Sequence, residues 1–210
     1  MSRLAGGKTD LKPRSVVDRS GGRGALRIIG GVWRRRRIAF PDVPGLRPTP
    51  DRVRETLFNW LGQDLAGFRC LDLYAGSGAL GFEALSRGAS HLVLVEHNPI
   101  VVRALGASAS MLQATRSLEI IRADALEFLR RQRGAVSNDD KGPFDLVFLD
   151  PPFDVGVPPE VFELLPSRLA VGARVYLECD SKPDLPAGWK TEKSSRAGQV
   201  HYQLLRLESE

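Results

Sequence analysis

The sequence contains few of the residues that build disulfide frameworks or metal sites. Among 210 residues there are 2 cysteines, 3 histidines and 2 methionines. The two cysteines, Cys70 and Cys179, lie in predicted strands without metal-ligand spacing, so we expect no metal site and interpret both as small core residues in a reducing cytoplasm. No apolar stretch approaches the ~20 residues that cross a membrane, and no apolar core of a signal peptide follows the charged N-terminus. These absences favour a cytoplasmic protein.

Positive charge is concentrated in the N-terminal quarter. Residues 1–50 contain 12 Lys+Arg against 3 Asp+Glu, whereas the remaining 160 residues contain 18 against 22. Residues 1–24 are rich in Gly, Ser and Arg and lack periodicity, which predicts a disordered basic arm. Four consecutive arginines, residues 34–37, are costly to hold together unless a polyanion neutralises them. This favours contact with nucleic-acid phosphates over a solvated charge run.

Apolar periodicity predicts alternating strands and helices, and a content of 42% apolar residues allows one α/β core. Apolar segments 26–33 and 38–40 flank the arginines and predict a hairpin. A helix is expected to follow, capped by Thr49 or Asp51 and ending near Leu61. Its apolar positions fall on one face: Val53, Leu57, Phe58 and Leu61.

Seven further strands are expected along the rest of the chain. They lie near residues 69–73, 91–95, 118–121, 144–149, 173–178, 189–194 and 199–207, with helices between the first five. The last two are too close for a helix between them and predict an antiparallel hairpin. The alternation implies a doubly wound, mostly parallel sheet with right-handed crossovers.

The segment Asp150-Pro151-Pro152-Phe153 directly follows the predicted strand at 144–149. Two prolines remove two backbone donors, so the strand ends and its carboxylate lies at the C-terminal edge, where α/β sheets bind ligands. A carboxylate, carbonyl oxygens and a flat ring suit a planar base with an exocyclic amine. A simple proline turn is the alternative interpretation.

A glycine-rich loop follows the predicted strand at 69–73. Residues 71–81 read LDLYAGSGALG, which places Gly76, Gly78 and Gly81 in the spacing of nucleotide-binding turns, with a helix expected at 82–87. Glu96 ends the next strand, at the sequence distance of an acid that binds a ribose hydroxyl. The glycines support a nucleoside site without deciding the rest of the cofactor.

Acidic residues recur at the ends of successive strands. Asp72 would repel a pyrophosphate, whereas it suits the ammonium and sulfonium groups of S-adenosylmethionine. Asp124 follows the next strand and could accept from the adenine amine. The structural alternatives are that Asp72 caps the loop, that Glu96 is a surface acid, and that Asp124 is the N-cap of a helix beginning at Ala125.

These motifs resemble those of class I S-adenosylmethionine-dependent methyltransferases that modify exocyclic amines. Residues 26–34, LRIIGGVWR, and 45–61, GLRPTPDRVRETLFNWL, closely resemble the RsmD family of guanine-N2 methyltransferases of bacterial small-subunit ribosomal RNA. The resemblance covers about residues 26–207. Pro50 departs from an expected threonine, and the four arginines after Trp33 and a polar insert at 137–142 are further departures.

The resemblance implies an α/β fold with a Rossmann-like, mostly parallel seven-stranded sheet, a C-terminal antiparallel hairpin and a small N-terminal β-hairpin extension. It divides the chain into an arm at 1–24, an RNA-contacting hairpin at 25–48 and a methyltransferase domain at 49–210. The implied catalytic residues are Asp150, Pro151, Pro152 and Phe153. The implied cofactor-binding residues are Asp72, Tyr74, Ala75, Gly76, Ser77, Gly78, Glu96, Asp124, Ala125, Thr49 and Arg52. The implied RNA-binding residues are Arg34, Arg35, Arg36, Arg37 and Arg47.

The implied reaction transfers a methyl group from S-adenosylmethionine to N2 of a specific guanine in 16S ribosomal RNA, free or within a small-subunit particle. A monomer is expected. Asp150 would orient the amine, and Phe153 would stack on the base, a contact worth about 1–3 kcal/mol. For Arg52 and Arg54, pairing with nearby acids on the helix is the alternative to gripping the cofactor carboxylate or an RNA phosphate. An adenine-N6 DNA methyltransferase, a nicotinamide dehydrogenase and a non-catalytic RNA-binding assembly protein remain alternatives.

Overall fold

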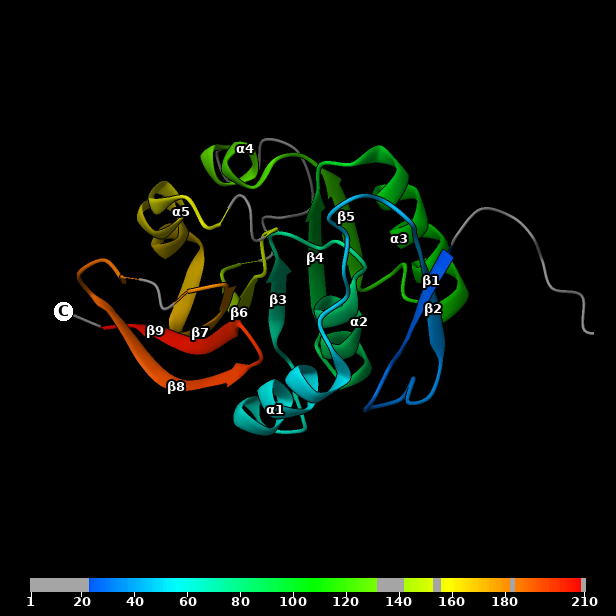
Figure 1. Cartoon of the computed structure of the whole chain (residues 1–210), viewed down its shortest axis with the longest axis horizontal. Coiled ribbons are helices and arrows are strands. Elements are labelled where there is room, and N and C mark those ends of the chain that lie inside the picture. Colours follow the sequence, from blue (N-terminus) through cyan, green and yellow to red (C-terminus); the bar gives the residue numbers. More distant parts are fainter. Residues whose placement is uncertain (1–22, 132–141, 153–155, 182–183, 209–210) are drawn as a thin grey trace, which may run out of the picture.

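A seven-stranded mixed sheet forms the centre of the protein (Figure 1). The computed structural model describes residues 23–131, 142–152, 156–181 and 184–208. The sheet order is β5-β4-β3-β6-β7-β9-β8. Its strands are β3 (Arg69–Asp72), β4 (His91–Glu96), β5 (Leu118–Arg122), β6 (Phe144–Leu149), β7 (Leu169–Cys179), β8 (Trp189–Ala197) and β9 (Val200–Leu207). The first five run parallel, whereas β9 is antiparallel to both β7 and β8. The predicted fold class is therefore confirmed.

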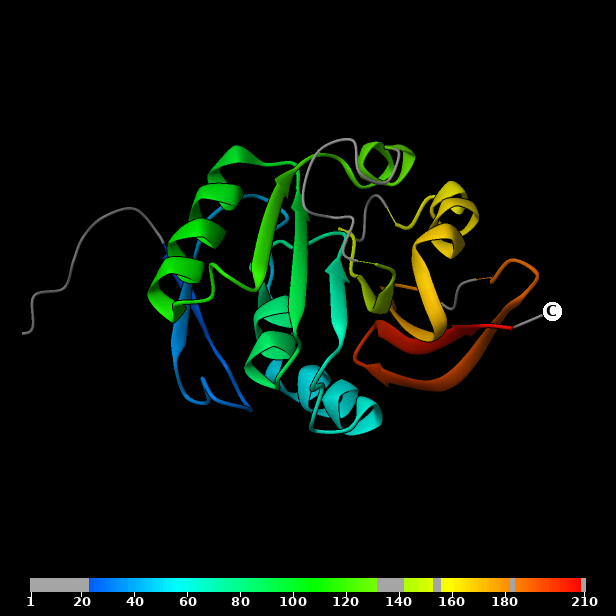
Figure 2. The same cartoon turned by 180° about the vertical axis from the view of Figure 1, so that it is seen from behind.

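Helices cover both faces of this sheet, as the two opposite views show (Figure 1, Figure 2). The first apolar cluster contains side chains from α1 (Asp51–Leu61), α2 (Ala79–Ser86) and α3 (Pro99–Leu112). The second contains side chains from α4 (Ala125–Arg130) and α5 (Pro159–Leu164), which leads into the 3-10 helix η2 (Leu165–Arg168). Each helix thus buries its apolar side against one face.

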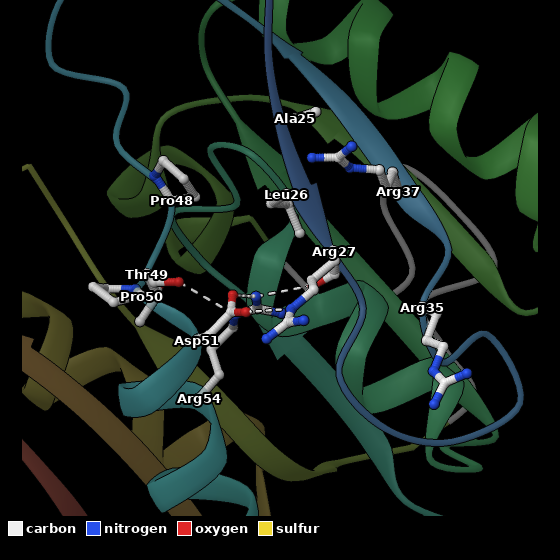
Figure 3. A pocket seen from close by; sticks show the side chains of 10 residues that line it. All are labelled: Ala25, Leu26, Arg27, Arg35, Arg37, Pro48, Thr49, Pro50, Asp51 and Arg54. Atoms are coloured by element: carbon white, nitrogen blue, oxygen red, sulfur yellow. Dashed lines mark hydrogen bonds and ion pairs between the residues drawn. The ribbon is translucent and has the colours of Figure 1, made fainter.

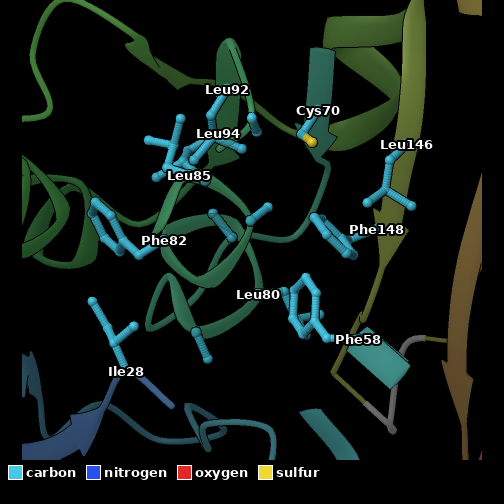
Figure 4. Packing of buried hydrophobic residues seen from close by; sticks show 14 of the residues in the cluster. Ile28, Phe58, Cys70, Leu80, Phe82, Leu85, Leu92, Leu94, Leu146 and Phe148 are labelled. Atoms are coloured by element: carbon cyan, nitrogen blue, oxygen red, sulfur yellow. The ribbon is translucent and has the colours of Figure 1, made fainter. Parts of the chain in front are cut away.

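The central strand β6 contributes to both clusters because side chains alternate along a strand. Leu146 and Phe148 belong to the first cluster, and Val147 and Leu149 belong to the second. Figure 4 shows Phe148 near Phe58 of α1, with ring centroids 6.4 Å apart. A strand buried on both faces reads as a continuous apolar run, which is the pattern from which β6 was predicted.

The N-terminal hairpin consists of β1 (Arg23–Arg27) and β2 (Arg37–Pro41), paired antiparallel. The prediction of a strand over 26–33 is wrong for most of its length. Past Ile28, the backbone N–H groups of Ile29 and Gly30 donate to the carboxylate of Glu83, at 2.9 and 2.7 Å, rather than to a neighbouring strand. The predicted arm at 1–24 overlaps β1 by two residues, and residues 1–22 lie outside the described part of the chain.

A buried charge network joins the hairpin to α1 and α2. Glu83 of α2 is fully buried and accepts from Arg54 at 3.2 Å and from Arg87 at 2.9 Å. Arg54, equally buried, also donates to the carbonyl oxygens of Arg27 and Thr49. Pairing with acids is therefore confirmed for Arg54, which is a structural cation inside the protein.

Two predicted helix boundaries are corrected. No side chain caps α1, whose N-cap residue is Pro50, so neither Thr49 nor Asp51 has the predicted capping role. The helix predicted at 82–87 begins earlier, at Ala79, because Gly78 adopts a left-handed conformation with φ of 78° and forms its N-cap. The predicted apolar face of α1 is confirmed, since all four of its residues are buried. Of the polar insert at 137–142, only Gly142 lies among the described residues.

Candidate active site

Five neighbouring strands each place one acidic residue at the same edge of the sheet. Parallel strands end at the same side, so their carboxyl ends form a common crevice. From β5 to β7 the acids are Asp124, Glu96, Asp72, Asp150 and Glu178. All of them except Glu178 were predicted from the sequence. The order of the strands places the five acids next to one another along this edge.

Asp150 lies half-buried directly after β6 and is held from the N-terminal side of the chain. The hydroxyl of Thr49 donates to Asp150 Oδ2 at 2.9 Å, across 101 residues of sequence. Burial raises the pKa of Asp150 to about 6, although the Thr49 hydrogen bond opposes this shift. One carboxylate oxygen is thus fixed by a protein hydroxyl, which orients the other toward a different partner.

Asp72 ends β3 and is almost fully buried. Burial raises the pKa of Asp72 to about 8, and the nearby carboxylates of Asp150 and Glu96 add to this, while backbone N–H groups of Tyr74 and Gly81 lower it. Its Oδ1 has no hydrogen-bond partner among the described residues. A buried acceptor without a partner is expensive, which indicates that a donor or a cation completes this site.

Tight packing inside the protein requires glycine at two positions between β3 and the first turn of α2. A Cβ on Gly78 would meet the Phe82 ring at 2.6 Å, and one on Gly81 would meet Leu94 at 2.6 Å. The first glycine makes the turn into α2, and the second lets α2 pack closely on β4. The N-cap residue Gly78 has no side chain to cap α2, and the N–H of Gly81 in the first turn donates to the Asp72 carboxylate.

Glu96 ends β4 and is buried behind this loop. Its Oε2 accepts from the N–H of Gly76 at 3.0 Å, and its Oε1 accepts from the N–H of Asn98 at 2.7 Å. The interpretation as a mere surface acid is therefore wrong. A carboxylate fixed in this way is oriented and keeps lone pairs available for a further donor.

Glu178, near the end of β7, was not singled out from the sequence. It is buried, and the Tyr176 hydroxyl donates to its Oε2 at 2.8 Å. Burial raises the pKa of Glu178 to about 8, and the charge of Asp150 adds to this, whereas the Tyr176 hydrogen bond opposes it. Asp72 and Asp150 were predicted because each is an acid at the end of an apolar strand. Glu178 has the same position in the predicted strand at 173–178, so the same pattern could have identified it.

A pocket opens between the hairpin and the segment that leads into α1, with a volume of about 570 Å³ (Figure 3). Thr49 lines the pocket, and its hydroxyl is the group that donates to Asp150. Arg35 and Arg37 of the predicted RNA-binding set also line it. The structure thus places Arg35 and Arg37 on the same pocket as Thr49, the residue that contacts the predicted catalytic acid.

Comparison with known proteins agrees with this geometry. Residues 26–206 match the family described as conserved hypothetical protein 95. The chain is 43% identical to ribosomal RNA small subunit methyltransferase D of Escherichia coli K12 over 194 residues, which covers 90% of this chain and 93% of that protein. It is 38% identical to the protein of the same name from Haemophilus influenzae, covering 87% and 94%.

The chain belongs to the RsmD family. The solved structure of yhhF from Escherichia coli is 43% identical, covers 89% of this chain and 100% of its own, and superposes with a TM-score of 0.75. The resemblance of the sequence motifs is therefore confirmed at the level of the family and of the fold. The individual roles of the site residues stay predictions.

The remaining predicted residues of this RsmD-family chain are distributed over the surface and the crevice. Asp124 accepts from the N–H groups of Leu126 and Glu127, so its helix-cap role is confirmed. Arg52 is exposed and has no side-chain partner in the described structure. Ala75 and Ser77 are buried in the glycine loop, and burial raises the pKa of Tyr74 to about 12, with the charge of Asp124 adding to this.

The other arginines of the predicted RNA-binding set lie on the surface. Arg34 and Arg36 are exposed on the turn of the hairpin, and Arg47 is exposed in the segment that leads to α1. Phe153, the predicted stacking residue, lies outside the described residues, and its role stays a prediction. Within the described ranges no group of histidine, cysteine, aspartate or glutamate side chains is arranged to hold a metal, and no helix is long and apolar enough to cross a membrane.

Proposed function

We propose that this protein transfers a methyl group from S-adenosylmethionine to the exocyclic N2 of a guanine in small-subunit ribosomal RNA. The observation that carries the proposal is the adjacency of Asp72 and Asp150, which follow neighbouring strands at the mouth of the glycine loop. One carboxylate suits the cationic end of the donor, and the other suits the acceptor amine. Membership of the RsmD family supports the same reaction.

The residues present fit the donor molecule. Glu96, buried and oriented by two N–H groups, would accept from the ribose hydroxyls, and the backbone around Gly76 and Gly78 would lie against the nucleoside. The free oxygen of Asp72 would accept from the ammonium group and face a positive charge. When bound, the donor supplies an electrophilic methyl carbon on a sulfonium.

Asp150 would act mainly by orientation and electrostatics. With a pKa of about 6 it is largely ionised at neutral pH, and Thr49 occupies one of its oxygens. The other oxygen would accept a hydrogen bond from the guanine amine and, with the carbonyl of Pro151, turn the nitrogen lone pair toward the methyl group. Asp150 would stabilise the positive charge that develops on the amine nitrogen during transfer, and solvent water would take the proton afterwards.

The RNA side of the site is supported by the hairpin. Arg34, Arg35, Arg36 and Arg37 are all exposed, and arginine forks match the geometry of backbone phosphates. The hairpin is tied to α2 through Glu83, so the arginines are held at a fixed place relative to the crevice. A rigid basic element beside a base-modifying crevice is suited to presenting one nucleotide to it.

Small-subunit particles from cells that lack this activity provide the test. The purified protein and S-adenosylmethionine are added to these particles and, separately, to their protein-free RNA, and the methylated nucleotide is mapped by reverse transcription. We expect modification of one guanine. Methylation scattered over many positions, or none in either substrate, would contradict the proposal.

A further inference from the structure

Glu178 and Asp150 lie next to each other at the C-terminal edge of the sheet. β6 and β7 run parallel with Leu149 opposite Leu177, and the next residue along each strand is one of these two acids. Neighbouring strands are about 4.8 Å apart. The charge of Asp150 contributes to the raised pKa of Glu178, as expected for two carboxyl groups that are close in space.

Both carboxyl groups lie on the face of the sheet that α1 covers. Phe148 and Tyr176 belong to the first apolar cluster, and side chains alternate along a strand, so residues two positions further on point to the same face. The Tyr176 hydroxyl accordingly donates to Glu178, and Thr49, just before α1, donates to Asp150. One bound base can therefore contact both acids.

Aromatic residues hold Glu178 in one orientation. The ring of Tyr176, whose hydroxyl donates to Glu178 Oε2 at 2.8 Å, is fully buried. Its centroid lies 6.4 Å from that of Phe148 and 6.5 Å from that of Tyr202. Tyr202 in turn stacks on Trp60 of α1 at 5.4 Å. A carboxyl group supported in this way has the fixed position that recognition of a ligand requires.

Each acid has one oxygen left for a ligand. Thr49 occupies Oδ2 of Asp150, and Tyr176 occupies Oε2 of Glu178. In the part of the chain that the structure describes, the other two oxygens, Asp150 Oδ1 and Glu178 Oε1, have no hydrogen-bond partner. Glu178 is only 3% exposed, and a buried carboxyl oxygen without a donor is expensive. Donors on a ligand would satisfy both oxygens.

The edge of guanine offers two donors of the kind that these oxygens require. Guanine has donors on neighbouring atoms, N1–H and the N2 amine, whereas adenine has an acceptor at N1 beside its amine. Enzymes that modify a base read it through hydrogen bonds to this edge. When Asp150 accepts from the N2 amine, the acceptor on the neighbouring strand is available to N1. That acceptor is Glu178.

We propose that Glu178 accepts a hydrogen bond from N1–H of the target guanine and thereby selects guanine over bases whose N1 has no hydrogen. The inference rests on the proposed function, because it places the N2 amine at Asp150. Asp150 orients the reacting nitrogen, whereas Glu178 contacts an atom that does not react and determines specificity. Tyr176 is a positioning residue that holds Glu178.

The ionisation of Glu178 sets the conditions for a test. Since its pKa is raised to about 8, mainly by burial, Glu178 is largely protonated near neutral pH. A donor to a carboxylate favours the ionised form, so N1–H of the base and the proton compete for this group. Assays at about pH 8.5 leave Glu178 largely ionised before the base binds.

The test compares guanine with 2-aminopurine at the target position of small-subunit RNA. 2-Aminopurine keeps the exocyclic 2-amino group but has a bare acceptor at N1. A synthetic segment carrying either base is ligated into the RNA, which is supplied free and assembled into particles. Transfer of labelled methyl groups gives kcat/KM for both bases with the wild type, E178Q, Y176F and the control D180N. Asp180 is an exposed acid two positions after Glu178.

We expect E178Q to lower the ratio of kcat/KM for guanine to that for 2-aminopurine about hundredfold. The amide oxygen of the new side chain accepts from Tyr176, so its NH2 group opposes N1–H of guanine and donates to N1 of 2-aminopurine. Y176F should lower the ratio about threefold to tenfold, because Glu178 loses its support. D180N should stay within about twofold of the wild type. Each ratio is compared with that of the wild type, which cancels the difference in reactivity between the two bases.

An unchanged ratio in E178Q would overturn the proposal, because a purely structural role lowers both rates alike. Calorimetry with S-adenosylmethionine shows whether E178Q is folded. Should E178Q not bind the donor, Y176F gives the same test, since it keeps the buried ring, and an unchanged ratio there would also overturn the proposal. Guanine methylation by the wild type with an unchanged ratio in the variants refutes only the role of Glu178. A wild-type protein that methylates no guanine refutes the proposed function and this inference with it.

Discussion

At the residue scale, Asp150 combines a predictable position with an unpredictable partner. Its place after an apolar strand and before two prolines was predicted from the sequence, because prolines end strands locally. Its hydrogen bond to Thr49 spans 101 residues and depends on how α1 packs against the sheet. No local pattern indicates such a contact.

Replacing Asp150 by alanine should abolish methyl transfer, because the amine loses its acceptor and its orienting group. Cofactor affinity should stay within about twofold, since we expect the donor to be bound mainly by the glycine loop, Asp72 and Glu96. Calorimetry measures the affinity, and transfer of labelled methyl groups measures turnover. Asp180→Ala, an exposed acid just after β7, is the control and should retain activity. Equal loss of binding and turnover in Asp150→Ala would contradict the assignment.

Thr49→Val should shift the pH dependence of the reaction. Burial raises the pKa of Asp150 to about 6 and the Thr49 hydrogen bond opposes this, so wild-type kcat/KM should fall as the pH drops through about 6. Without the hydroxyl the pKa rises further, and this acidic limb should move to higher pH. Loss of one charge-assisted hydrogen bond should also lower kcat about tenfold.

Thr49→Ser keeps the hydroxyl and should restore both the kcat and the pH profile. Steady-state rates measured between about pH 5 and 9 locate the acidic limb, and comparison of Thr49→Ser with Thr49→Val separates loss of the hydroxyl from other effects of the substitution. An acidic limb at the same pH in Thr49→Val and the wild type would contradict the positioning role.

At the element scale, the sheet could be predicted and the docking of the hairpin could not. Apolar patterns predicted all seven strands of the sheet. A strand buried on both faces is a continuous apolar run, and a strand buried on one face alternates, so both patterns are visible in the local sequence. The first hairpin strand was predicted too long because Ile29 and Gly30 donate to Glu83, a residue more than 50 positions away. Glu83, Arg54 and Glu178 are buried polar residues. Apolar periodicity does not identify such residues as part of the interior.

Glu83→Ala should destabilise the protein by about 3–5 kcal/mol, because it leaves Arg54 and Arg87 buried without their carboxylate. Urea unfolding followed by circular dichroism measures the change in the free energy of unfolding. Glu127→Ala removes an exposed acid of α4 that pairs with Arg131 and should change stability by about 0.5 kcal/mol or less. Similar effects for the two variants would show that the network does not hold the hairpin.

At the scale of the whole molecule, the excess positive charge and the acids of the crevice come from different parts of the chain. Residues 1–50 contain the excess of Lys and Arg, and the rest of the chain is net acidic. The acids from β3, β4 and β6 meet at one edge of the sheet, beside the basic hairpin pocket. RNA binding and cofactor binding should therefore respond differently to ionic strength.

Raising the salt concentration from about 50 to about 200 mM should weaken RNA binding by tenfold or more, because phosphate contacts release counterions. Binding of S-adenosylmethionine should change by less than about twofold, since its site is largely buried and screened less by salt. Anisotropy and calorimetry at matched salt concentrations give the two constants. A parallel loss of both affinities would contradict the separation of the two sites.

Asp150 is proposed to lie beside guanine N2 when that nitrogen receives the methyl group. This proposal is tested most directly by incubating the protein with donor carrying a deuterated methyl group and small-subunit RNA that lacks the modification, then analysing the nucleosides by mass spectrometry. We expect deuterium in N2-methylguanosine with the wild-type protein, and none with the Asp150→Ala protein. Label in N6-methyladenosine, label in DNA alone, or the same product from Asp150→Ala would contradict it.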